Sequence, residues 1–476
     1  MLDALDIILI GVLLGSTLLF ILLFRRLRKD LVIIELKFRQ ESEELKRERE
    51  RNNNLLSRVV KPVPLEKQIS ADKPDTQKFK MVTVLFADIE GFTGIVDVMN
   101  PESLIDELDR FFLKFDSVVE HYNIEKIKTI GDAYMCAGGI PVKNKTNPVE
   151  VILAALHMNS YMKDMQAHKG HEVWSLRIGI DTGPVIAGTI GSLKPVYDIW
   201  GMTVNVASRM ESSSAAGKIN ITENTYMFVK EYFSCTYRGR MPVKNKGDIN
   251  MYFVDGIIPQ LSVTERCFLP NKDFNTQLQL LRLGDLEEFV LEKLEKGLPK
   301  NLYYHNLKHT VDVYTEVELI GRAEGLSEEE LLLIRTAALL HDAGHLLDYQ
   351  YHEEMGVKLA KEILPQYQYS PDQIEIISSI IMATKMPPNP KNLLEMIICD
   401  ADLDYLGRTD FIPVSNNLFR ELHEQGRIES LEKWNRLQVD FIEHHQYFTQ
   451  TAQKLRNVNK NIQLDKIRSL LTNPVL

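Results

Sequence analysis

An apolar run that stops at an acidic residue beside a glycine constrains this chain most. The run Val82–Ala87 ends at Asp88, and Gly91 follows in the next turn. This pattern predicts a short buried strand that delivers a carboxylate to a tight turn, where the carboxylate can hold a hard cation and free backbone N–H groups can hold phosphate oxygens. Because the arrangement recurs at Gly131 and Asp132, two converging carboxylates would form a two-metal site for phosphoryl chemistry.

Two further blocks extend this pattern. Arg177–Gly191 reads RIGIDTGPVIAGTIG and predicts a strand, a Gly-Pro turn and a second strand, as in a hairpin. Tyr197–Ser212 predicts a strand that leads into a helix with Asn205 and Arg209 four apart on one face. The four blocks in this order resemble the class III nucleotidyl cyclase catalytic domain, which implies an α+β, ferredoxin-like domain over residues 78–257.

The resemblance implies one group of residues that hold metal and phosphate. Asp88 and Asp132 match the family's metal ligands, and the backbone carbonyl of Ile89 adds a third contact. The turn that contains Phe92 and Thr93 would offer backbone donors to the phosphates. Two Mg²⁺ or Mn²⁺ ions per cyclase site suit such oxygen ligands.

The resemblance implies a second group that binds and turns over the nucleotide. Lys128 can donate to adenine N1 and Asp198 can accept from the N6 amine, whereas guanylate cyclases place Glu and Cys there, so the pair implies ATP. Asn205 would orient the ribose, and Arg209 would stabilise charge on the α-phosphate in the transition state. The triphosphate would also contact Arg177 and Lys244, with Lys246 in place of Lys244 if the register slips.

The family's site also implies a partner. In the family the metal pair comes from one subunit and the Lys, Asp, Asn and Arg group from the other. This chain carries both groups, so the resemblance implies a homodimer with two equivalent sites that converts ATP to cAMP and pyrophosphate, and a monomer with none.

The N-terminal segment predicts a membrane anchor. Ile7–Phe24 contains 18 residues without a charge, which reaches the length that spans a bilayer. Basic residues at 25–29 place the rest of the chain on the cytoplasmic side of an inner or plasma membrane and residues 1–6 outside it. A cleaved signal peptide is the alternative, but its basic n-region and small-residue cleavage site are absent.

Two features near the anchor predict helix pairing. Gly11 and Gly15 form a GxxxG, a possible dimer face of the transmembrane helix, although two small residues also occur by chance. Residues 31–60 are rich in Glu, Arg and Lys and carry an imperfect heptad. They predict a helical linker that forms a parallel two-stranded coiled coil or remains a single solvated helix.

Charge and cysteine content exclude other classes of protein. The net charge of −10 argues against a nucleic-acid binder. The four cysteines are scattered without CxxC spacing, which indicates a reducing compartment rather than a disulfide framework or a zinc site.

Residues 270–476 read almost entirely as helices and carry a second group of ligand-type residues. His305 and His309 are four apart on a predicted helix, His341 and Asp342 end another apolar helix, and Asp402 follows a third apolar run. Side chains of these types from separate helices can bind a metal in the core of a helical bundle.

This constellation resembles the HD superfamily of metal phosphohydrolases, and its YHN…H…HD…H spelling is closest to class I cyclic-nucleotide phosphodiesterases. The resemblance implies that Asp342 bridges to a second metal, that His305 is the general acid for the leaving 3′-oxygen, and that His345 orients the attacking hydroxide. It implies one or two divalent metals (Mn²⁺, Mg²⁺, Zn²⁺ or Fe), the first held by His309, His341, Asp342 and Asp402.

The spelling also departs from phosphodiesterases. Leu346 and Leu347 replace the expected Gly and Asn, and His352 beside Glu353 resembles other HD hydrolases. Hydrolysis of cAMP to AMP is therefore one expectation; action on another phosphoester and a non-catalytic, metal-stabilised regulatory domain are the alternatives. Three further candidate site residues are His352, Asp400 as a competitor of Asp402, and Gln438 as a faint counterpart of the purine-clamping Gln.

Overall fold

The computed structural model describes residues 76–169, 174–190, 196–243, 247–263 and 268–472. The predicted membrane anchor at 7–24, its GxxxG and the predicted coiled coil at 31–60 lie outside the described residues. Within the described ranges, no helix combines the length and the apolar character needed to cross a membrane.

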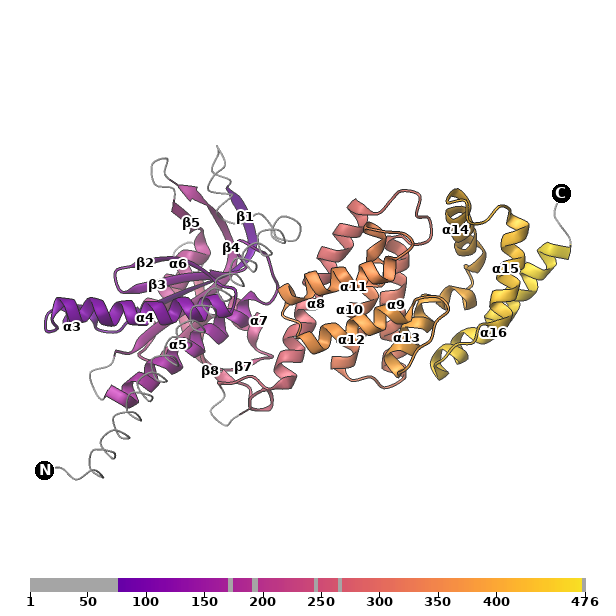
Figure 1. Cartoon of the computed structure of the whole chain (residues 1–476). Helices are drawn as coiled ribbons and strands as arrows, with labels where there is room; N and C mark the ends of the chain where they lie inside the picture. Colours follow the sequence, from indigo (N-terminus) through magenta and orange to yellow (C-terminus); the bar gives the residue numbers. More distant parts are fainter. Residues whose placement is uncertain (1–75, 170–173, 191–195, 244–246, 264–267, 473–476) are drawn as a thin grey trace, which may run out of the picture. The chain divides into compact units, whose positions relative to one another are not determined.

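The N-terminal described domain is built on one mixed sheet (Figure 1). Its described strands run in the order β2-β3-β1-β4-β6-β8-β7, and β5 pairs with β4 outside this order. Only β4 and β6 pair in parallel; the other described pairs are antiparallel. The strands are β1 (Gln77–Ile89), β2 (Glu125–Ile130), β3 (Ala133–Gly138), β4 (Leu176–Ile190), β5 (Val196–Trp200), β6 (Lys218–Thr222), β7 (Phe233–Val243) and β8 (Gly247–Ile257).

Helices cover both faces of this sheet because its strands are apolar on both sides. On β1, Leu85 and Ala87 belong to the core beneath α4 and α5, whereas Val84 and Phe86 pack in a second core with Ala207 of α6. The helices of this domain are α3 (Phe92–Val96), α4 (Pro101–His121), α5 (Asn147–Lys169), α6 (Met202–Ser212) and α7 (Glu223–Val229).

The predicted hairpin at residues 177–191 is wrong. The segment continues as one 15-residue strand, β4, through Gly183 and Pro184. β1 pairs along it with a register shift between Phe79 and Val82, opposite the Gly-Pro pair. Pro184 has no N–H for the ladder, and a bulge at that point lets the strand continue without one. Beyond this shift, the pairing brings Arg177 directly opposite Asp88.

The C-terminal described domain is helical (Figure 1). Ser327 and Glu330 form a capping box that starts the apolar helix α10. The elements are η1 (Pro259–Leu261), α8 (Lys272–Gly297), α9 (Leu307–Ala323), α10 (Glu328–Leu340), η2 (Ala343–Leu346), α11 (His352–Ile363), η3 (Leu364–Tyr367), α12 (Pro371–Ala383), α13 (Leu393–Asp402), η4 (Asp404–Gly407), α14 (Phe411–Glu424), α15 (Leu431–His444) and α16 (Gln450–Thr472).

Helix α8 contributes to two cores. Phe274 in its first turns belongs to the core of the sheet domain, and Leu286 belongs to the core of the helical domain. Between them, Arg282 donates to the Glu150 carboxylate of α5 at 2.8 Å, and both side chains are buried. A buried charge pair of this kind requires both partners, because either charge alone would be left without compensation.

Candidate active sites

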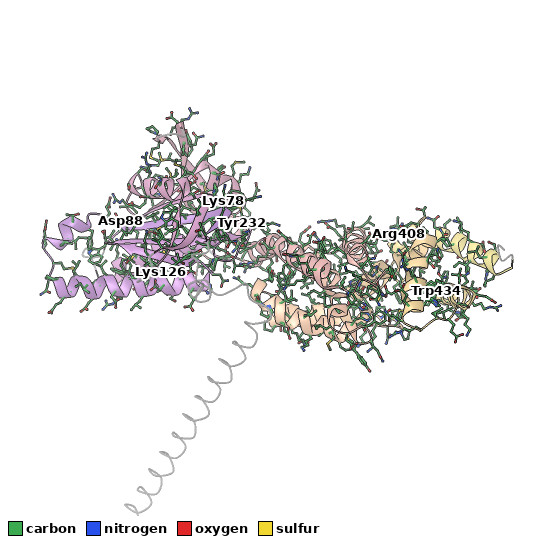
Figure 2. The ribbon with its side chains drawn as sticks, turned by 90° about the horizontal axis from the view of Figure 1, so that it is seen from above. Lys78, Asp88, Lys126, Tyr232, Arg408 and Trp434 are labelled. Atoms are coloured by element: carbon green, nitrogen blue, oxygen red, sulfur yellow. The ribbon has the colours of Figure 1, made fainter. Side chains whose placement is uncertain are left out.

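Two carboxylates converge at one end of the sheet. Asp88 lies near the end of β1 (Figure 2), and Asp132 lies in the tight turn between β2 and β3, where Gly131 has a φ of +63°. Burial and the neighbouring Asp88 carboxylate raise the pKa of Asp132 to about 6. Such mutual repulsion between acidic groups is the electrostatic signature of a place for a cation, and an all-oxygen donor set suits Mg²⁺ or Mn²⁺.

An arginine lies against one of these carboxylates. Arg177 Nη2 is 2.6 Å from Asp88 Oδ2 and 3.2 Å from Glu211 Oε1. The hydrogen bond to Asp88 is the main cause that raises the pKa of Arg177. Arg177, the predicted phosphate contact, thus forms an ion pair with Asp88, the predicted metal ligand, within one chain.

The predicted purine-reading residues also meet. Lys128 Nζ on β2 lies 2.5 Å from Asp198 Oδ2 on β5. The other carboxylate oxygen of Asp198 accepts from the backbone N–H of Ile199 at 2.9 Å, which fixes its orientation. The structure therefore places a cationic donor and an anionic acceptor side by side.

The remaining predicted cyclase residues lie on exposed elements. Asn205 and Arg209 are exposed on one face of α6, whereas Phe92 and Thr93 begin the short helix α3 after Gly91. Lys244 and Lys246 lie outside the described residues. Among the described residues, no hydrogen bond or ion pair joins the Asp88–Arg177 group to the Lys128–Asp198 group. In the described residues the two groups are thus two separate ion-paired clusters.

In the helical domain, four ligand-type side chains converge as predicted. His309 Nε2 lies 3.0 Å from Asp402 Oδ1, 3.3 Å from Asp342 Oδ2 and 3.3 Å from His341 Nε2. His341 Nε2 is 3.4 Å from Asp342 Oδ2 and 3.7 Å from Asp402 Oδ1. These residues come from α9, the end of α10 and the end of α13, and three of the four are buried.

The chemistry of this group fits a divalent cation. His341 Nδ1 lies 2.8 Å from the Ala338 carbonyl oxygen, which leaves Nε2 to face the other ligands. Burial disfavours a charged imidazole, but hydrogen bonds to Asp342 and Asp402 outweigh it and raise the pKa of His309 to about 9. Asp342 Oδ2 is buried, and the two histidine Nε2 atoms approach it only to 3.3 Å and 3.4 Å. A cation would satisfy that oxygen and replace the proton shared by the group.

A second histidine cluster adjoins Asp342. The rings of His345 and His352 are stacked with centroids 4.1 Å apart, and His305 lies 4.7 Å from His345. His345 is buried, and neither of its ring nitrogens has a hydrogen-bond partner among the described residues. Burial lowers its pKa to about 3, so the ring is neutral and free to bind a second cation or an attacking water.

The prediction that His305 lies on a helix with His309 is wrong. Asn306 is the N-cap of α9, and its side chain accepts from the backbone N–H groups of Lys308 and His309, so the helix starts after His305. His305 Nδ1 instead lies 2.5 Å from Glu421 Oε1 of α14. The two histidines still lie close, with ring centroids 6.0 Å apart.

Glu421 is the functional residue that sequence reasoning missed. It is fully buried and accepts from the backbone N–H groups of Tyr304 at 2.8 Å and His305 at 3.2 Å and from the Tyr349 hydroxyl at 3.1 Å. This carboxylate fixes both the position and the tautomer of His305. Its only signal in the sequence is one acidic residue on an amphipathic helix, which a solvated face explains equally well.

Two weaker candidates have structural partners elsewhere. Asp400 accepts from the backbone N–H groups of Phe448 and Thr449, each at 2.8 Å, so the structure places Asp402 rather than Asp400 beside His309. Gln438 accepts from the Ser415 hydroxyl at 2.5 Å and is absent from the residues that line the adjoining cavity. The side-chain oxygen of Gln438 is thus already engaged by Ser415.

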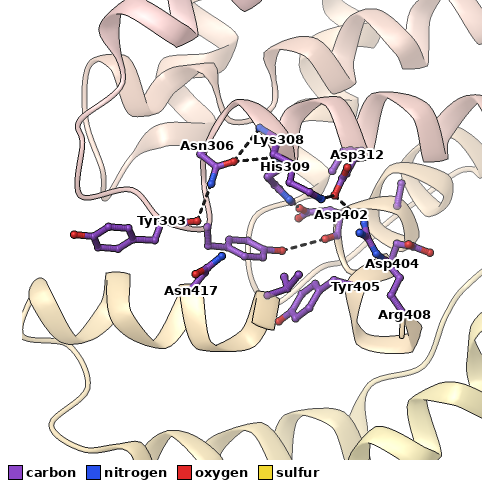
Figure 3. A pocket seen from close by; sticks show the side chains of 14 residues that line it. Tyr303, Asn306, Lys308, His309, Asp312, Asp402, Asp404, Tyr405, Arg408 and Asn417 are labelled. Atoms are coloured by element: carbon purple, nitrogen blue, oxygen red, sulfur yellow. Dashed lines mark hydrogen bonds and ion pairs between the residues drawn. The ribbon is translucent and has the colours of Figure 1, made fainter. Parts of the chain in front are cut away.

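A small cavity of about 50 Å³ opens beside the metal-type cluster (Figure 3). Its wall includes His309 and Asp402 together with the polar side chains of Asn306, Lys308 and Asn417. Arg408 also lines the cavity, where Asp312 holds it at 2.8 Å. Donors of this kind beside a metal-type cluster suit a small anionic ester.

Family models match both domains. Residues 75–256 match the adenylate and guanylate cyclase catalytic domain, and residues 306–404 match the HD domain. This chain carries a class III nucleotidyl cyclase catalytic domain and a C-terminal HD domain. The resemblance to both families is thereby confirmed.

Individual relatives match the cyclase part of the chain. An adenylate cyclase of Mycobacterium tuberculosis is 39% identical over 191 residues, which are 40% of this chain and 42% of the relative. Guanylate cyclase 32E of Drosophila melanogaster is 34% identical over 220 residues, 45% of this chain and 19% of the relative. The chain thus spans less than half the length of these curated relatives, and both nucleotide specificities occur among them.

A solved structure also matches this part. The catalytic core of a rhodopsin-guanylyl cyclase with converted specificity, in complex with ATPαS, is 36% identical. The match covers 38% of this chain and 97% of that one, with a TM-score of 0.36.

Proposed function

We propose that this chain is a homodimeric adenylate cyclase that converts ATP to cAMP and pyrophosphate, and that its HD domain hydrolyses cAMP to AMP. The choice of ATP rests on one observation, the 2.5 Å pair between Lys128 and Asp198. A cationic donor beside an anionic acceptor complements adenine N1 and N6, and guanine presents the opposite pattern. Because such polar pairs reject the wrong partner strongly, this pair supports ATP over GTP.

In the proposed cyclase reaction, the ribose O3′ forms a bond to the α-phosphorus, the bond to the pyrophosphate oxygen breaks, and the hydroxyl proton passes to solvent water. Asp88 and Asp132 would hold the divalent ions, which supply charge neutralisation and activate the hydroxyl. Asn205 orients the ribose, and Arg209 stabilises the negative charge that develops on the α-phosphate. Arg177 contributes a further contact to the phosphates.

The homodimer is supported by the separation of the two ion-paired clusters. Asn205 and Arg209 point from an exposed face of α6, and no described contact joins Lys128 or Asp198 to Asp88. A second copy with the same surfaces can bring the missing group to each metal pair, so that two equivalent sites form between two chains.

In the proposed HD reaction, water adds to the cyclic phosphate and the P–O3′ bond breaks. His305, held by Glu421, donates a proton to the leaving 3′-oxygen. His309, His341, Asp342 and Asp402 would hold the first cation, which supplies Lewis-acid activation of the phosphate. His345 and Asp342 border the position where the attacking water or a second cation would lie.

A second candidate is an HD domain that acts on another phosphoester. It is favoured by Gln438, the counterpart of the purine-clamping Gln, because its side-chain oxygen already accepts from the Ser415 hydroxyl. A non-catalytic regulatory HD domain would leave the Glu421–His305 pair without a chemical role.

Location at a membrane is also part of the proposal. It is supported by the 18 uncharged residues at 7–24 and by the basic residues that follow them. The predicted coiled coil at 31–60 would help to hold two copies together.

The test measures the cAMP and the AMP that the full chain forms in the presence of Mn²⁺. With ATP, the wild type should form cAMP and then AMP, Asp342→Ala should accumulate cAMP, and Asp88→Ala should form neither. With cAMP, cGMP and other phosphoesters supplied directly, Asp88→Ala should still hydrolyse cAMP. Turnover of another ester without turnover of cAMP would refute the phosphodiesterase assignment, and His305→Ala with unchanged cAMP accumulation and retained metal would indicate a non-catalytic domain.

A further inference from the structure

Arg177 lies between two carboxylates that have different roles. Its Nη2 contacts Asp88 Oδ2 at 2.6 Å and Glu211 Oε1 at 3.2 Å. Under the proposed function, Asp88 must give its oxygen to a divalent cation, and a guanidinium on the same oxygen competes with that cation and repels it. Arg177 therefore has to leave Asp88 but stay close enough to reach the triphosphate.

Glu211 is built as a second place for this guanidinium. Its side chain is buried on α6, where Oε2 accepts from the Ser212 hydroxyl at 3.1 Å and Oε1 is 3.2 Å from Arg177 Nη2. Arg177 Nε is buried and without a partner in the part of the chain described. The Arg177 side chain thus keeps an unused donor, Nε, next to its existing 3.2 Å contact with Glu211 Oε1.

The two side chains are carried by elements that cannot easily separate. A Cβ added to Gly179 on β4 would lie 1.8 Å from the backbone nitrogen of Glu211, so the strand and α6 are in direct backbone contact there. Arg177 is two residues away on the same strand. Asn205 and Arg209 occupy the exposed face of α6, whereas Glu211 faces the sheet. The Glu211 carboxylate is therefore held at a fixed place beside Arg177.

We propose that Glu211 is a positioning residue that takes over the Arg177 guanidinium when Asp88 binds its cation. This inference rests on the proposed metal site at Asp88 and Asp132. Without Glu211, Arg177 remains on Asp88 and opposes metal binding. With it, Arg177 turns away from the metal ligand, remains charged and ordered, and needs little further ordering to meet the phosphates.

The test measures Mn²⁺ binding to the full chain without nucleotide, by the electron paramagnetic resonance of the free ion. The Mn²⁺ binding that is lost in Asp132→Asn is assigned to the cyclase site, and the binding that remains is assigned to the HD domain. Glu211→Gln should weaken this part about fivefold, and Arg177→Ala should strengthen it about fivefold, as expected for coupled charged neighbours. In the Arg177→Ala background, Glu211→Gln should change the affinity by less than about twofold, because the group that it repositions is gone.

The matched control is Glu150→Gln, which also removes a buried carboxylate from an arginine pair in the same domain. It should leave the Mn²⁺ isotherm unchanged even if it lowers the melting temperature as much as Glu211→Gln does. Glu211→Asp, which keeps the charge, should restore the affinity to within about twofold of wild type.

Two outcomes would overturn the inference, and they differ. If Glu211→Gln weakens Mn²⁺ binding equally with and without Arg177, or if Arg177→Ala fails to tighten it, the positioning role is wrong while the metal site stands. If no part of the wild-type isotherm depends on Asp132, the metal site itself fails and the positioning role fails with it.

Discussion

The cyclase site and the HD site differ in how much of each one a single chain completes. In the HD domain, ligand atoms from three helices lie 3.0–3.7 Å apart around one point. In the cyclase domain, the predicted functional residues pair among themselves, Arg177 with Asp88 and Lys128 with Asp198. Asn205 and Arg209 face outward.

This difference follows from what each site must hold. A cation needs only a few inward-facing donors, so the core of one helical domain can enclose it. A nucleoside triphosphate needs contacts to its base, ribose and phosphates over a larger surface, which two copies would supply together under the proposed function. We therefore expect cyclase activity to depend on chain concentration and HD activity to be independent of it.

The largest effect is expected from Asp342→Asn, which removes the charge that borders both histidine clusters. Metal content of the HD domain and hydrolysis of cAMP should fall at least about a hundredfold, beyond the range typical of an outer-shell change. Elemental analysis and an AMP assay measure both. Asp400→Asn, equally buried but bound to Thr449, should leave the metal in place. If Asp342→Asn kept its metal, Asp342 would not be a ligand of the metal bound by the HD domain.

The cyclase half of the comparison is sharpened by Lys128→Glu combined with Asp198→Cys. The ratio of kcat/KM for ATP to that for GTP should fall about a hundredfold, because the exchanged pair complements guanine and leaves adenine unpaired. The control is Lys126→Glu, which changes a neighbouring lysine that pairs with Asp116. An unchanged ratio in the double variant would mean that these residues do not read the base.

A smaller effect is expected at Glu421. Glu421→Gln removes the acceptor that orients His305 and should reduce cAMP hydrolysis about tenfold to a hundredfold, with the metal content unchanged. Glu424→Gln, on the same helix but exposed, serves as its control. Full hydrolytic activity in Glu421→Gln would remove the argument for His305 as a held general acid.

The smallest effects concern pH, where the two metal sites should respond in different ranges. Protonation of Asp132, whose pKa is raised to about 6, removes a metal ligand, so Mn²⁺ affinity of the cyclase site should fall as the pH drops through 6. At the HD site, the cation competes with a proton for His309, whose pKa is about 9 before metal binds. The metal affinity of that site should therefore fall as the pH drops below 9. Each loss should approach about tenfold per pH unit. Binding isotherms measured from pH 5 to pH 9 would contradict this difference if both metal sites lost affinity in the same pH range.

The parts of these sites that sequence predicted are those fixed by local pattern. The apolar run before Asp88 forms β1, and Asp402 ends α13, because strand ends and helix ends follow from neighbouring residues. Local pattern failed where a distant element decided the outcome. β4 continues through Pro184 because it pairs with β1 on both sides of this residue, whereas the sequence predicted a turn there.

Long-range partners were also invisible in the sequence. Glu421 acts on His305 across 116 positions of the chain, and Glu211 reaches Arg177 only because β4 packs directly on α6. An acidic residue on an amphipathic helix is most often a solvated surface residue, so neither was identifiable before the fold was known.

The shared cyclase site is tested most directly by a heterodimer of Asp88→Ala and Arg209→Ala chains, co-expressed with different tags and purified through both. Each variant alone should be inactive as a cyclase. The heterodimer should recover about half of the wild-type rate, because one of its two sites keeps every residue. A heterodimer of Asp342→Ala and His305→Ala chains should recover no cAMP hydrolysis, since each HD site lies within one chain. A cyclase heterodimer as inactive as its parents would contradict the account.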